Sequence, residues 1–299
     1  EVFFSLNDVE KNILINLNRY EKKQFKLNEH TVKARELMGN INLVMFSPDD
    51  LLLIKGPPSL RRKFIDLEIS QTSKFYYKDL LQYNRIVQRR NTLLKRIYER
   101  NINKSQLETW DEQLSVKAAS LVKKRKEALR KLAMLASLMN RRLTDSKENL
   151  ATQYYQPYFI KGEDDFENTL NPEWYLKKLK ETIDIDLSRK MTTIGPHRDD
   201  IIFLNNGINL RNYGSQGQQR TGVLAFKLAE LEYIKSEVGE YPVLLLDDVM
   251  SELDEQRREH LINFVRDKIQ TFITTTDINI FKNPKFTKFY IVKKGNITE

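Results

Sequence analysis

The chain has 299 residues, a formal net charge of +9 and 40% hydrophobic residues, so it is long enough to bury a sizeable core. It contains no cysteine and only three scattered histidines, which excludes disulfides and thiolate metal sites and argues against a histidine-based zinc site. No apolar run approaches the roughly 18 residues that span a bilayer, and no secretory leader opens the sequence, so we expect a cytoplasmic protein with no membrane partner.

Residues 1–60 are expected to form β-hairpins and one further strand. Val2–Leu6 and Asn12–Leu17 predict two paired strands, and Ile41–Phe46 predicts a third strand that ends in a turn at residues 47–50. Because residue 1 is Glu and the sequence opens inside a predicted strand, we expect this segment to be the remnant of a first lobe whose beginning has been cut away.

Residues 61–190 are expected to form a helical arm. Apolar side chains recur at helical spacing, a looser stretch interrupts them at Tyr154–Glu167, and Asn171-Pro172 starts a further short helix. Between Arg85 and Leu150, 17 Lys or Arg stand against 7 Asp or Glu, so this segment carries the positive excess of the chain. Long basic helices fit a phosphate backbone, so DNA contact is predicted here. The predicted contacts are Lys123, Lys124, Arg125, Lys126 and Arg130. The alternative is a solvated surface whose lysine stems cover apolar groups.

Residues 191–299 return to a strand pattern and are expected to form a second lobe. Asp200–Leu204, the turn Asn206-Gly207 and Ile208–Leu210 predict a hairpin, and Phe272–Thr275 predicts a later strand. At Gly195–Asp199, two interpretations stay open: Arg198 reaches a phosphate or the DNA backbone, or it pairs locally with Asp199.

A loop rich in Gly, Ser and Gln opens directly into a helix after Tyr213. Free backbone N–H groups and the positive end of the helix dipole favour a bound phosphate there. The predicted phosphate contacts are Ser215, Gln216, Gly217 and Gln218. The alternative is an ordinary helix start in which Ser215 is the N-cap.

An apolar strand, Val243–Asp247, ends in two consecutive carboxylates. Ligands of open α/β sheets lie at the carboxyl ends of such strands. We predict that Asp247 holds Mg²⁺ and that Asp248 positions or deprotonates a water beside the γ-phosphate of a nucleotide. The alternative role for Asp248 is that of an N-cap or loop partner.

Matching phrases, in one order along most of the chain, resemble the RecF family of bacterial recombination mediators within the ABC-type ATPases. They are Phe46–Leu51, Ile54–Gly56, Arg61–Asp66, Gly195–Asp200, Tyr213–Thr221, Leu244–Asp254 and Phe272–Asp277. The resemblance implies an α/β fold, the ABC-type ATPase head, with a mixed sheet, flanking helices and an inserted helical arm.

The resemblance also implies roles for particular residues. The loop at Ser215 becomes the signature loop, which closes over ATP held by a second copy, and Ser251 and Asp254 lie in the D-loop that crosses between subunits. Asp254 can equally cap the helix that follows it. Thr276 stands where transporters of the wider class carry a histidine, and its hydroxyl can sense the γ-phosphate without carrying charge.

The phosphate-binding P-loop pattern Gly-x-x-x-x-Gly-Lys-Ser/Thr occurs nowhere in the 299 residues. The family carries it just upstream of this sequence, so we expect that the segment bearing this Walker A motif has been removed. We therefore expect weak ATPase activity from the full-length dimer and none from these residues alone. Loss of that segment is also expected to leave the Asp247 strand without a neighbour in its sheet.

The implied function is that of an ATP-dependent, DNA-binding mediator of recombination, DNA repair and replication restart, acting in the SOS response. It would dimerise on ATP and release on slow hydrolysis, with ATP and Mg²⁺ as cofactors. Implied partners are double- and single-stranded DNA, a second copy of the chain, and the recombinase-loading protein RecR. Two alternatives stay open: a structural head like that of SMC proteins, and a DNA-binding helical module with a vestigial ATPase.

Overall fold

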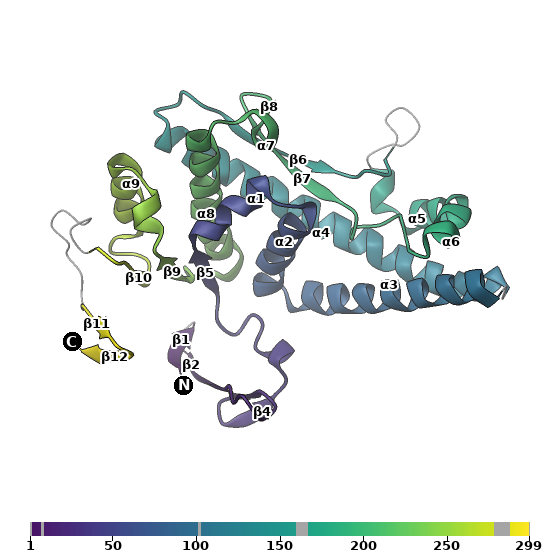
Figure 1. The fold of residues 1–299 in the computed structure, drawn as a ribbon, viewed down its shortest axis with the longest axis horizontal. Coiled ribbons are helices and arrows are strands. Elements are labelled where there is room, and N and C mark those ends of the chain that lie inside the picture. Colours follow the sequence, from purple (N-terminus) through teal and green to yellow (C-terminus); the bar gives the residue numbers. More distant parts are fainter. Residues whose placement is uncertain (1, 7–8, 101–102, 160–166, 278–287, 299) are drawn as a thin grey trace.

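The computed structural model describes residues 2–6, 9–100, 103–159, 167–277 and 288–298. The molecule is elongated (Figure 1). Helices α8 (Gln216–Val238) and α9 (Glu255–Val265) lie with a parallel sheet toward one end, and the long helices α3 (Lys74–Arg100) and α4 (Glu108–Leu143) reach toward the other.

The N-terminal part is an antiparallel meander. β1 (Val2–Leu6), β2 (Val9–Asn16), β3 (Gln24–Leu27) and β4 (His30–Val32) pair in chain order, and a 3₁₀ turn, η1 (Ala34–Glu36), follows. The predicted pairing of the first two strands is confirmed. Among the described side chains of this sheet, only Ile13 is buried, so the meander contributes little to the main core.

Three parallel strands form the sheet that carries the predicted carboxylates. β9 (Val243–Asp247) lies between β5 (Leu43–Phe46) and β10 (Thr271–Thr274), and it buries Leu244 and Leu246. The expectation that the Asp247 strand lacks a neighbour is therefore wrong, because β5 pairs along one side of it and β10 along the other.

η2 (Pro48–Leu51) and α1 (Leu52–Lys55) follow β5 within residues 1–60. Helices fill most of the segment predicted to be an arm: α2 (Pro58–Thr72) enters it, η3 (Lys104–Leu107) precedes α4, and η4 (Asn168–Leu170) precedes α5 (Pro172–Glu181) and α6 (Ile183–Arg189). The helix predicted at Asn171-Pro172 is confirmed, with the Asn171 side chain accepting a hydrogen bond from the backbone N–H of Glu173 at 2.9 Å.

A second, antiparallel sheet joins the arm segment to the second-lobe segment. β6 (Leu150–Tyr155) pairs with β7 (Asp200–Asn205), which pairs with β8 (Ile208–Asn209) in the predicted hairpin. The looser stretch expected from Tyr154 thus begins as the end of a strand. Its strand character depends on a partner about 50 residues later in the chain.

The remaining elements surround α8. α7 (Leu210–Tyr213) precedes it, η5 (Val249–Glu252) links β9 to α9, and β11 (Ile291–Lys293) and β12 (Asn296–Thr298) form a C-terminal hairpin. α8 is buried on several faces, with Leu224, Ala225 and Phe226 fully covered, and it packs along α4. One hydrophobic core runs from the parallel sheet through α8 into α4. The division into residues 1–60, 61–190 and 191–299 stays a prediction, and this core and the β6–β7 pairing cross its second boundary.

Candidate nucleotide-binding and metal-binding edge

Asp247 stands at the exposed carboxyl end of β9, where strand and sheet geometry direct it away from the core. Thr274, opposite it at the end of β10, donates a hydrogen bond from its hydroxyl to the Asp247 carboxylate at 2.6 Å. The ends of parallel strands meet at one edge of a sheet, so this contact follows from the topology. We name Asp247, Asp248 and Thr274 together the β9 edge.

Asp248 adopts a left-handed backbone conformation with φ 51° immediately after the strand. Its N–H donates to the backbone carbonyl and hydroxyl oxygens of Thr274 at 3.2 and 3.1 Å, and its carbonyl accepts from the Ser251 hydroxyl at 2.7 Å. These contacts fix the Asp248 backbone, and none of them involves its carboxyl group. Although Asp248 precedes η5, its side chain makes no capping hydrogen bond, which argues against the alternative role as an N-cap.

One oxygen of the Asp248 carboxyl group, Oδ1, is buried and has no hydrogen-bond partner among the described residues. A buried acceptor without a partner is unfavourable, so such an atom calls for a ligand that completes it. In the described part of the chain, no group of three or more His, Cys, Asp or Glu side chains is placed to hold a metal ion alone. Mg²⁺ is usually held by one or two carboxylates together with waters and substrate phosphates. The oxygen donors of the β9 edge fit that kind of shared site.

The signature loop, Gly214–Gln218, begins α8. The Ser215 hydroxyl oxygen accepts from the Gln218 N–H at 3.2 Å, and the Gln218 side-chain oxygen accepts from the Ser215 N–H at 3.0 Å. The predicted N-cap is thus present. It does not exhaust the loop, because Ser215, Gln216 and Gly217 are exposed and the Ser215 hydroxyl keeps its proton free to donate.

The two glycines of the signature loop differ in what the fold requires. A Cβ at Gly214 would lie 2.6 Å from the carbonyl oxygen of Leu210, so the chain itself excludes a side chain there. A Cβ at Gly217 would meet only the Ser215 hydroxyl oxygen, at 3.9 Å. The open space at Gly217 therefore admits close approach of another molecule to the backbone.

Polar contacts tie the start of α8 to the D-loop segment after the β9 edge. Arg220 forms an ion pair with Glu252 at 2.7 Å, and the Arg257 side chain donates to the Thr221 hydroxyl at 3.0 Å. Asp254 caps α9 by accepting from the Arg257 N–H at 2.9 Å, as the alternative role for Asp254 predicts. In the sequence, the exposed Ser251 lies between Asp248 and Glu252, and its hydroxyl donates to the Asp248 carbonyl.

The predicted DNA-contacting residues separate into two groups. Lys123, Lys124 and Arg130 are exposed on α4, although Lys124 is within 3.0 Å of Glu127. Lys126 is half-buried and donates to the Thr169 hydroxyl at 2.7 Å, and burial lowers its pKa to about 8. The prediction for Arg125 is wrong because its side chain is buried inside the protein.

Arg125 belongs to a buried joint between the arm and head segments, made by Arg61, Arg62, Asp66, Arg125, Asp199 and Asp200. Arg125 binds both carboxylate oxygens of Asp66 at 2.8 Å and donates to the Pro196 carbonyl at 2.5 Å. Arg61 binds both oxygens of Asp200, at 2.6 and 3.0 Å, and donates to the Gly56 carbonyl. Several of the phrases that carry the family resemblance thus meet in one structural network.

The Gly195–Asp199 segment also belongs to this joint, and Arg198 does not pair with Asp199 in the described structure, whereas its predicted contact with a phosphate or the DNA backbone stays a prediction. Arg198 donates to the Thr192 carbonyl at 2.8 Å, whereas the buried Asp199 accepts from the hydroxyls of Tyr154 and Tyr158, each at 2.5 Å. Burial raises the pKa of Asp199 to about 6. His197 contacts the Tyr83 hydroxyl at 2.6 Å, and burial lowers its pKa to about 4.

Sequence reasoning missed three contributors to the site. The first is Thr274, which donates to Asp247. The sequence pattern points instead to Thr276, which is exposed and makes no hydrogen bond with any described residue. The parallel pairing of the two predicted strands was the signal that would have located Thr274. Arg220 and Glu252 form a contact between segments 32 residues apart, and no local pattern marks it.

Among the described helices, none combines the length and apolar character that a membrane crossing requires. No family model matches the chain. The chain is similar to the DNA replication and repair protein RecF of Alkaliphilus oremlandii, with 48% identity over 288 residues that cover 95% of this chain and 77% of the relative. It is 41% identical to the protein of the same name from Halothermothrix orenii, over 100% of this chain and 80% of the relative.

Solved structures agree with these relatives. The fold matches a structure described as the recombination mediator protein RecF-ATP in the RecFOR pathway, with TM-score 0.86 and 36% identity over 97% of this chain and 76% of that one. A structure described as RecF-ATPrS matches with TM-score 0.85 and 34% identity over the same shares.

Proposed function

Because this chain belongs to the RecF family of DNA replication and repair proteins, we propose that it acts as an ATP-dependent, DNA-binding recombination mediator. The observation that carries the proposal for the site is the buried Oδ1 of Asp248, which has no hydrogen-bond partner in the described part of the chain and stands next to the exposed Asp247 at the end of β9. An ATP-bound structure of a relative supports ATP as the nucleotide.

At the β9 edge, Asp247 would hold Mg²⁺, oriented by the hydrogen bond from Thr274. The ion would supply positive charge that offsets the charge of the triphosphate. Asp248 Oδ1 would accept a hydrogen bond from the attacking water and orient it, so that an oxygen–phosphorus bond forms at the γ-phosphate while the bond to the β-phosphate oxygen breaks. The proton that the water loses would pass to the Asp248 carboxylate or to the released phosphate. ABC-type ATPases usually carry Glu at this place, and the shorter Asp fits slow hydrolysis.

The signature loop would complete the nucleotide site of a second copy. Ser215 can donate its hydroxyl proton to a phosphate oxygen, the exposed N–H groups at Gln216 and Gly217 add to the positive end of the α8 dipole, and Gln218 fixes the cap. The absence of a side chain at Gly217 favours close approach of the γ-phosphate. The site would thus be shared between subunits of an ATP-dependent homodimer.

The contacts between α8 and the D-loop give the two halves of this site a physical connection. Arg220–Glu252 and Arg257–Thr221 link the helix that would touch the partner's nucleotide to the segment that follows Asp248. Ser251 and Asp254 in that segment would lie at the subunit boundary. Dimer formation and water positioning would then influence one another, and the difference in contacts between ATP and ADP would drive release. Thr276, two residues beyond β10, keeps only a proposed sensing role.

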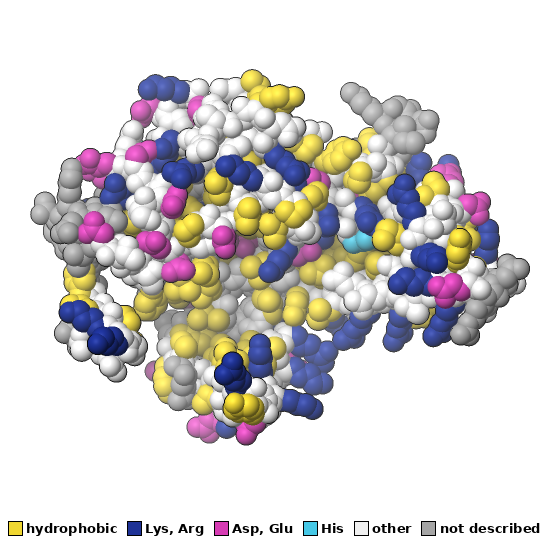
Figure 2. All heavy atoms as spheres, viewed as in Figure 1, with side chains coloured by type: hydrophobic (Ala, Val, Ile, Leu, Met, Phe, Trp, Pro, Cys, Tyr) yellow, Lys and Arg dark blue, Asp and Glu magenta, His cyan; other side chains and the backbone are white. Residues whose placement is uncertain are grey.

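DNA would be bound electrostatically by exposed basic residues of the arm. Lys123 and Arg130 are seven residues apart on α4 and therefore share a face, and Lys124 is adjacent. Lys126 lies at the margin of this group. Figure 2 shows further Lys and Arg side chains along the edge of the molecule formed by α3, a different helix from the one that carries these proposed DNA contacts. The DNA bound would be single- and double-stranded, and a RecR-like recombinase-loading protein would be a partner. We propose that the protein acts in the cytoplasm.

The test compares the full-length protein with its Asp248→Asn variant, which preserves shape and removes the charge. ATP hydrolysis should fall at least about 100-fold, while DNA retention with ATP should lengthen relative to ADP. Asp267→Asn, in an exposed position after α9, is the matched control and should hydrolyse ATP at the original rate.

Unchanged hydrolysis by Asp248→Asn would remove the role proposed for this residue. Equal DNA retention with ATP, with ADP and without nucleotide would favour instead a helical DNA-binding module with a vestigial ATPase.

A further inference from the structure

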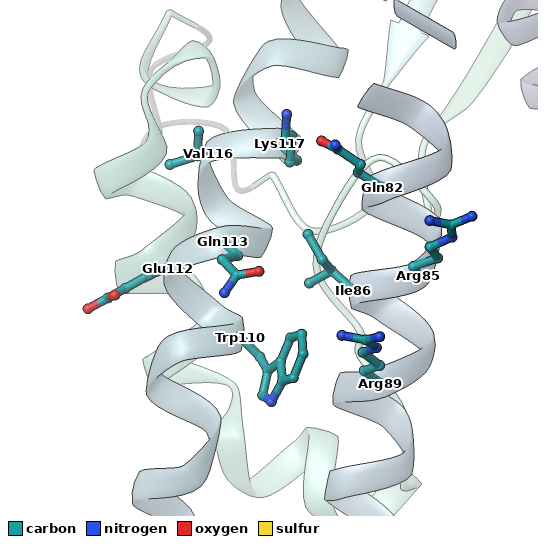
Figure 3. Close-up of a pocket in the computed structure, with 9 residues that line it drawn as sticks. All are labelled: Gln82, Arg85, Ile86, Arg89, Trp110, Glu112, Gln113, Val116 and Lys117. Carbon is teal, nitrogen blue, oxygen red and sulfur yellow. The ribbon is translucent and has the colours of Figure 1, made fainter. Parts of the chain in front are cut away.

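A groove of about 570 Å³ runs between α3 and α4 (Figure 3). The helix α3 lies away from the strand β9 and its edge (Figure 1). Ile86 and Arg89 of α3 face Trp110, Gln113 and Val116 of α4 across it. A second hollow of about 490 Å³ shares Arg89 and Trp110 with the first, so the two form one continuous feature, which we name the arm groove.

The floor of the arm groove is apolar. Ile86 is almost fully buried, Trp110 is half-buried against the main core, and Val116 is 54% exposed. The Arg89 guanidinium lies 5.3 Å from the centre of the Trp110 ring, within cation–π distance. An exposed aliphatic side chain beside a partly covered indole leaves apolar surface that a ligand can cover.

The rim of the arm groove is positive and incompletely neutralised. Arg85, Arg89 and Arg96 are exposed and make no ion pair or hydrogen bond with any described residue. The one lysine among the lining residues, Lys117, is paired with Asp79 at 2.5 Å. The one acidic residue of the lining, Glu112, points away from the space between the helices (Figure 3). The three arginines repel one another unless an anion lies near them.

The two walls of the groove are held in place from below. Arg90, one residue from Arg89, is fully buried and bridges Asp111 of α4 and Asp186 of α6, at 2.6 Å each. Leu114 of α4, next to Gln113 of the lining, is also buried. A groove preformed in this way lets a ligand bind without first ordering the protein.

We propose that the arm groove binds an acidic protein segment that carries an apolar or aromatic anchor residue. The unpaired arginines match the acidic side chains, and the apolar floor matches the anchor. Duplex DNA presents phosphates to a protein surface and would leave this concave apolar floor uncovered, so the lining favours a peptide over DNA. The proposal is independent of the nucleotide site and of the DNA contacts proposed for Lys123 and Arg130.

The experiment uses tryptophan fluorescence of the full-length protein. The described chain places Trp110 in the groove and Trp174 in a buried position, so a ligand in the groove changes the Trp110 signal. The probe is a short peptide of Asp and Glu with one central Phe. A peptide with Ser in place of Phe and a duplex DNA oligonucleotide serve as comparison ligands.

We expect saturable binding of the Phe peptide, at least about tenfold weaker binding of the Ser peptide, and at least about tenfold weaker binding of the Phe peptide by Arg89→Glu. Arg266→Glu, an equal charge change at an exposed position after α9 and outside the groove, is the matched control and should bind the Phe peptide as the unchanged protein does. If Arg89→Glu fails to fold by circular dichroism, Arg85→Glu takes its place, because both side chains are exposed.

Three results would overturn the proposal. They are no saturable binding of the Phe peptide, equal weakening by Arg89→Glu and Arg266→Glu, and displacement of the peptide by duplex DNA that itself changes the Trp110 signal. The last result would make the arm groove a nucleic-acid site.

Discussion

The buried joint and the β9 edge are both rich in charged residues, and both carry phrases of the family resemblance, but they use their charges differently. In the joint, the carboxylates of Asp66 and Asp200 are each held by two hydrogen bonds from one arginine. At the β9 edge, Asp247 receives one described hydrogen bond and Asp248 Oδ1 receives none.

This contrast separates structural from functional charge. A carboxylate whose oxygens are bound by a buried guanidinium has little capacity left for a ligand, and its removal chiefly affects folding. A carboxylate at a strand end whose oxygens have few hydrogen-bond partners can still bind a ligand. Motifs of similar specificity in the sequence thus divide, in the structure, into a joint that positions the arm and an edge that is open to chemistry.

The largest effect should come from breaking the joint. We expect Arg125→Ala to lower the free energy of unfolding by about 3–5 kcal/mol, because Asp66 would keep its charge without its main partner. Urea unfolding measures this. Arg130→Ala on the same helix is exposed and should change stability by less than about 0.5 kcal/mol. Equal, small effects of the two substitutions would show that the Arg125–Asp66 pair is not a structural element.

The second effect concerns pH and His197. The pKa of His197 is lowered from its usual value of about 6.5 to about 4 in the folded protein. As the pH falls through this range, the histidine therefore binds a proton in the unfolded chain before it does so in the folded protein. This residue should therefore lower stability by about 3 kcal/mol between pH 6.5 and pH 4. Asp199 acts in the opposite direction, since its pKa is raised in the folded state and its charged form is favoured by unfolding.

The contribution of His197 is isolated by the difference between the original protein and His197→Gln, since Asp199 is present in both. We expect the stability of the original protein relative to His197→Gln to fall on acidification through this window, measured by urea unfolding at several pH values. His30→Gln, an exposed histidine in the N-terminal sheet, should give a profile parallel to that of the original protein. A parallel profile for His197→Gln as well would mean that His197 titrates normally.

The third effect concerns Lys123 and Arg130, which are exposed on the helix that carries the buried Arg125. Lys123→Ala and Arg130→Ala should each reduce the slope of log affinity for duplex DNA against log salt by about 0.9, the value for one lost phosphate contact. Lys22→Ala, in the exposed loop between β2 and β3, is the control and should leave the slope unchanged. If neither α4 substitution alters the slope, the DNA face lies elsewhere on the molecule.

The elements with local signals were predictable from the sequence. β9 is a short apolar run bounded by Pro242 and two carboxylates, and the start of α8 is marked by Ser215 with Gln218 three residues later. The RecF family was likewise recognisable from phrases that stand together in the chain, and the relatives confirm it.

Features that depend on distant residues were not predictable in this way. Arg125 lies within a run of basic residues at helical spacing, yet its burial depends on Asp66 and on the Pro196 carbonyl, 59 and 71 residues away. β6 contains Thr, Gln and Tyr and becomes a strand through pairing with β7. In both cases, tertiary contacts override the local pattern.

The smallest effect sharpens the comparison within the signature loop, where the two glycines should respond with opposite signs. Gly217→Ala should stabilise the protein by about 0.5–1 kcal/mol, because Ala lowers the entropy of the unfolded chain and the new Cβ has room in the helix. The same Cβ would occupy the space proposed for a partner's phosphate, so ATP-dependent dimerisation of the full-length protein should weaken. Gly214→Ala should instead destabilise the protein, because its Cβ would meet the Leu210 carbonyl. Urea unfolding and sedimentation with ATP measure the two quantities, and unimpaired dimerisation of Gly217→Ala would place the phosphate away from this loop.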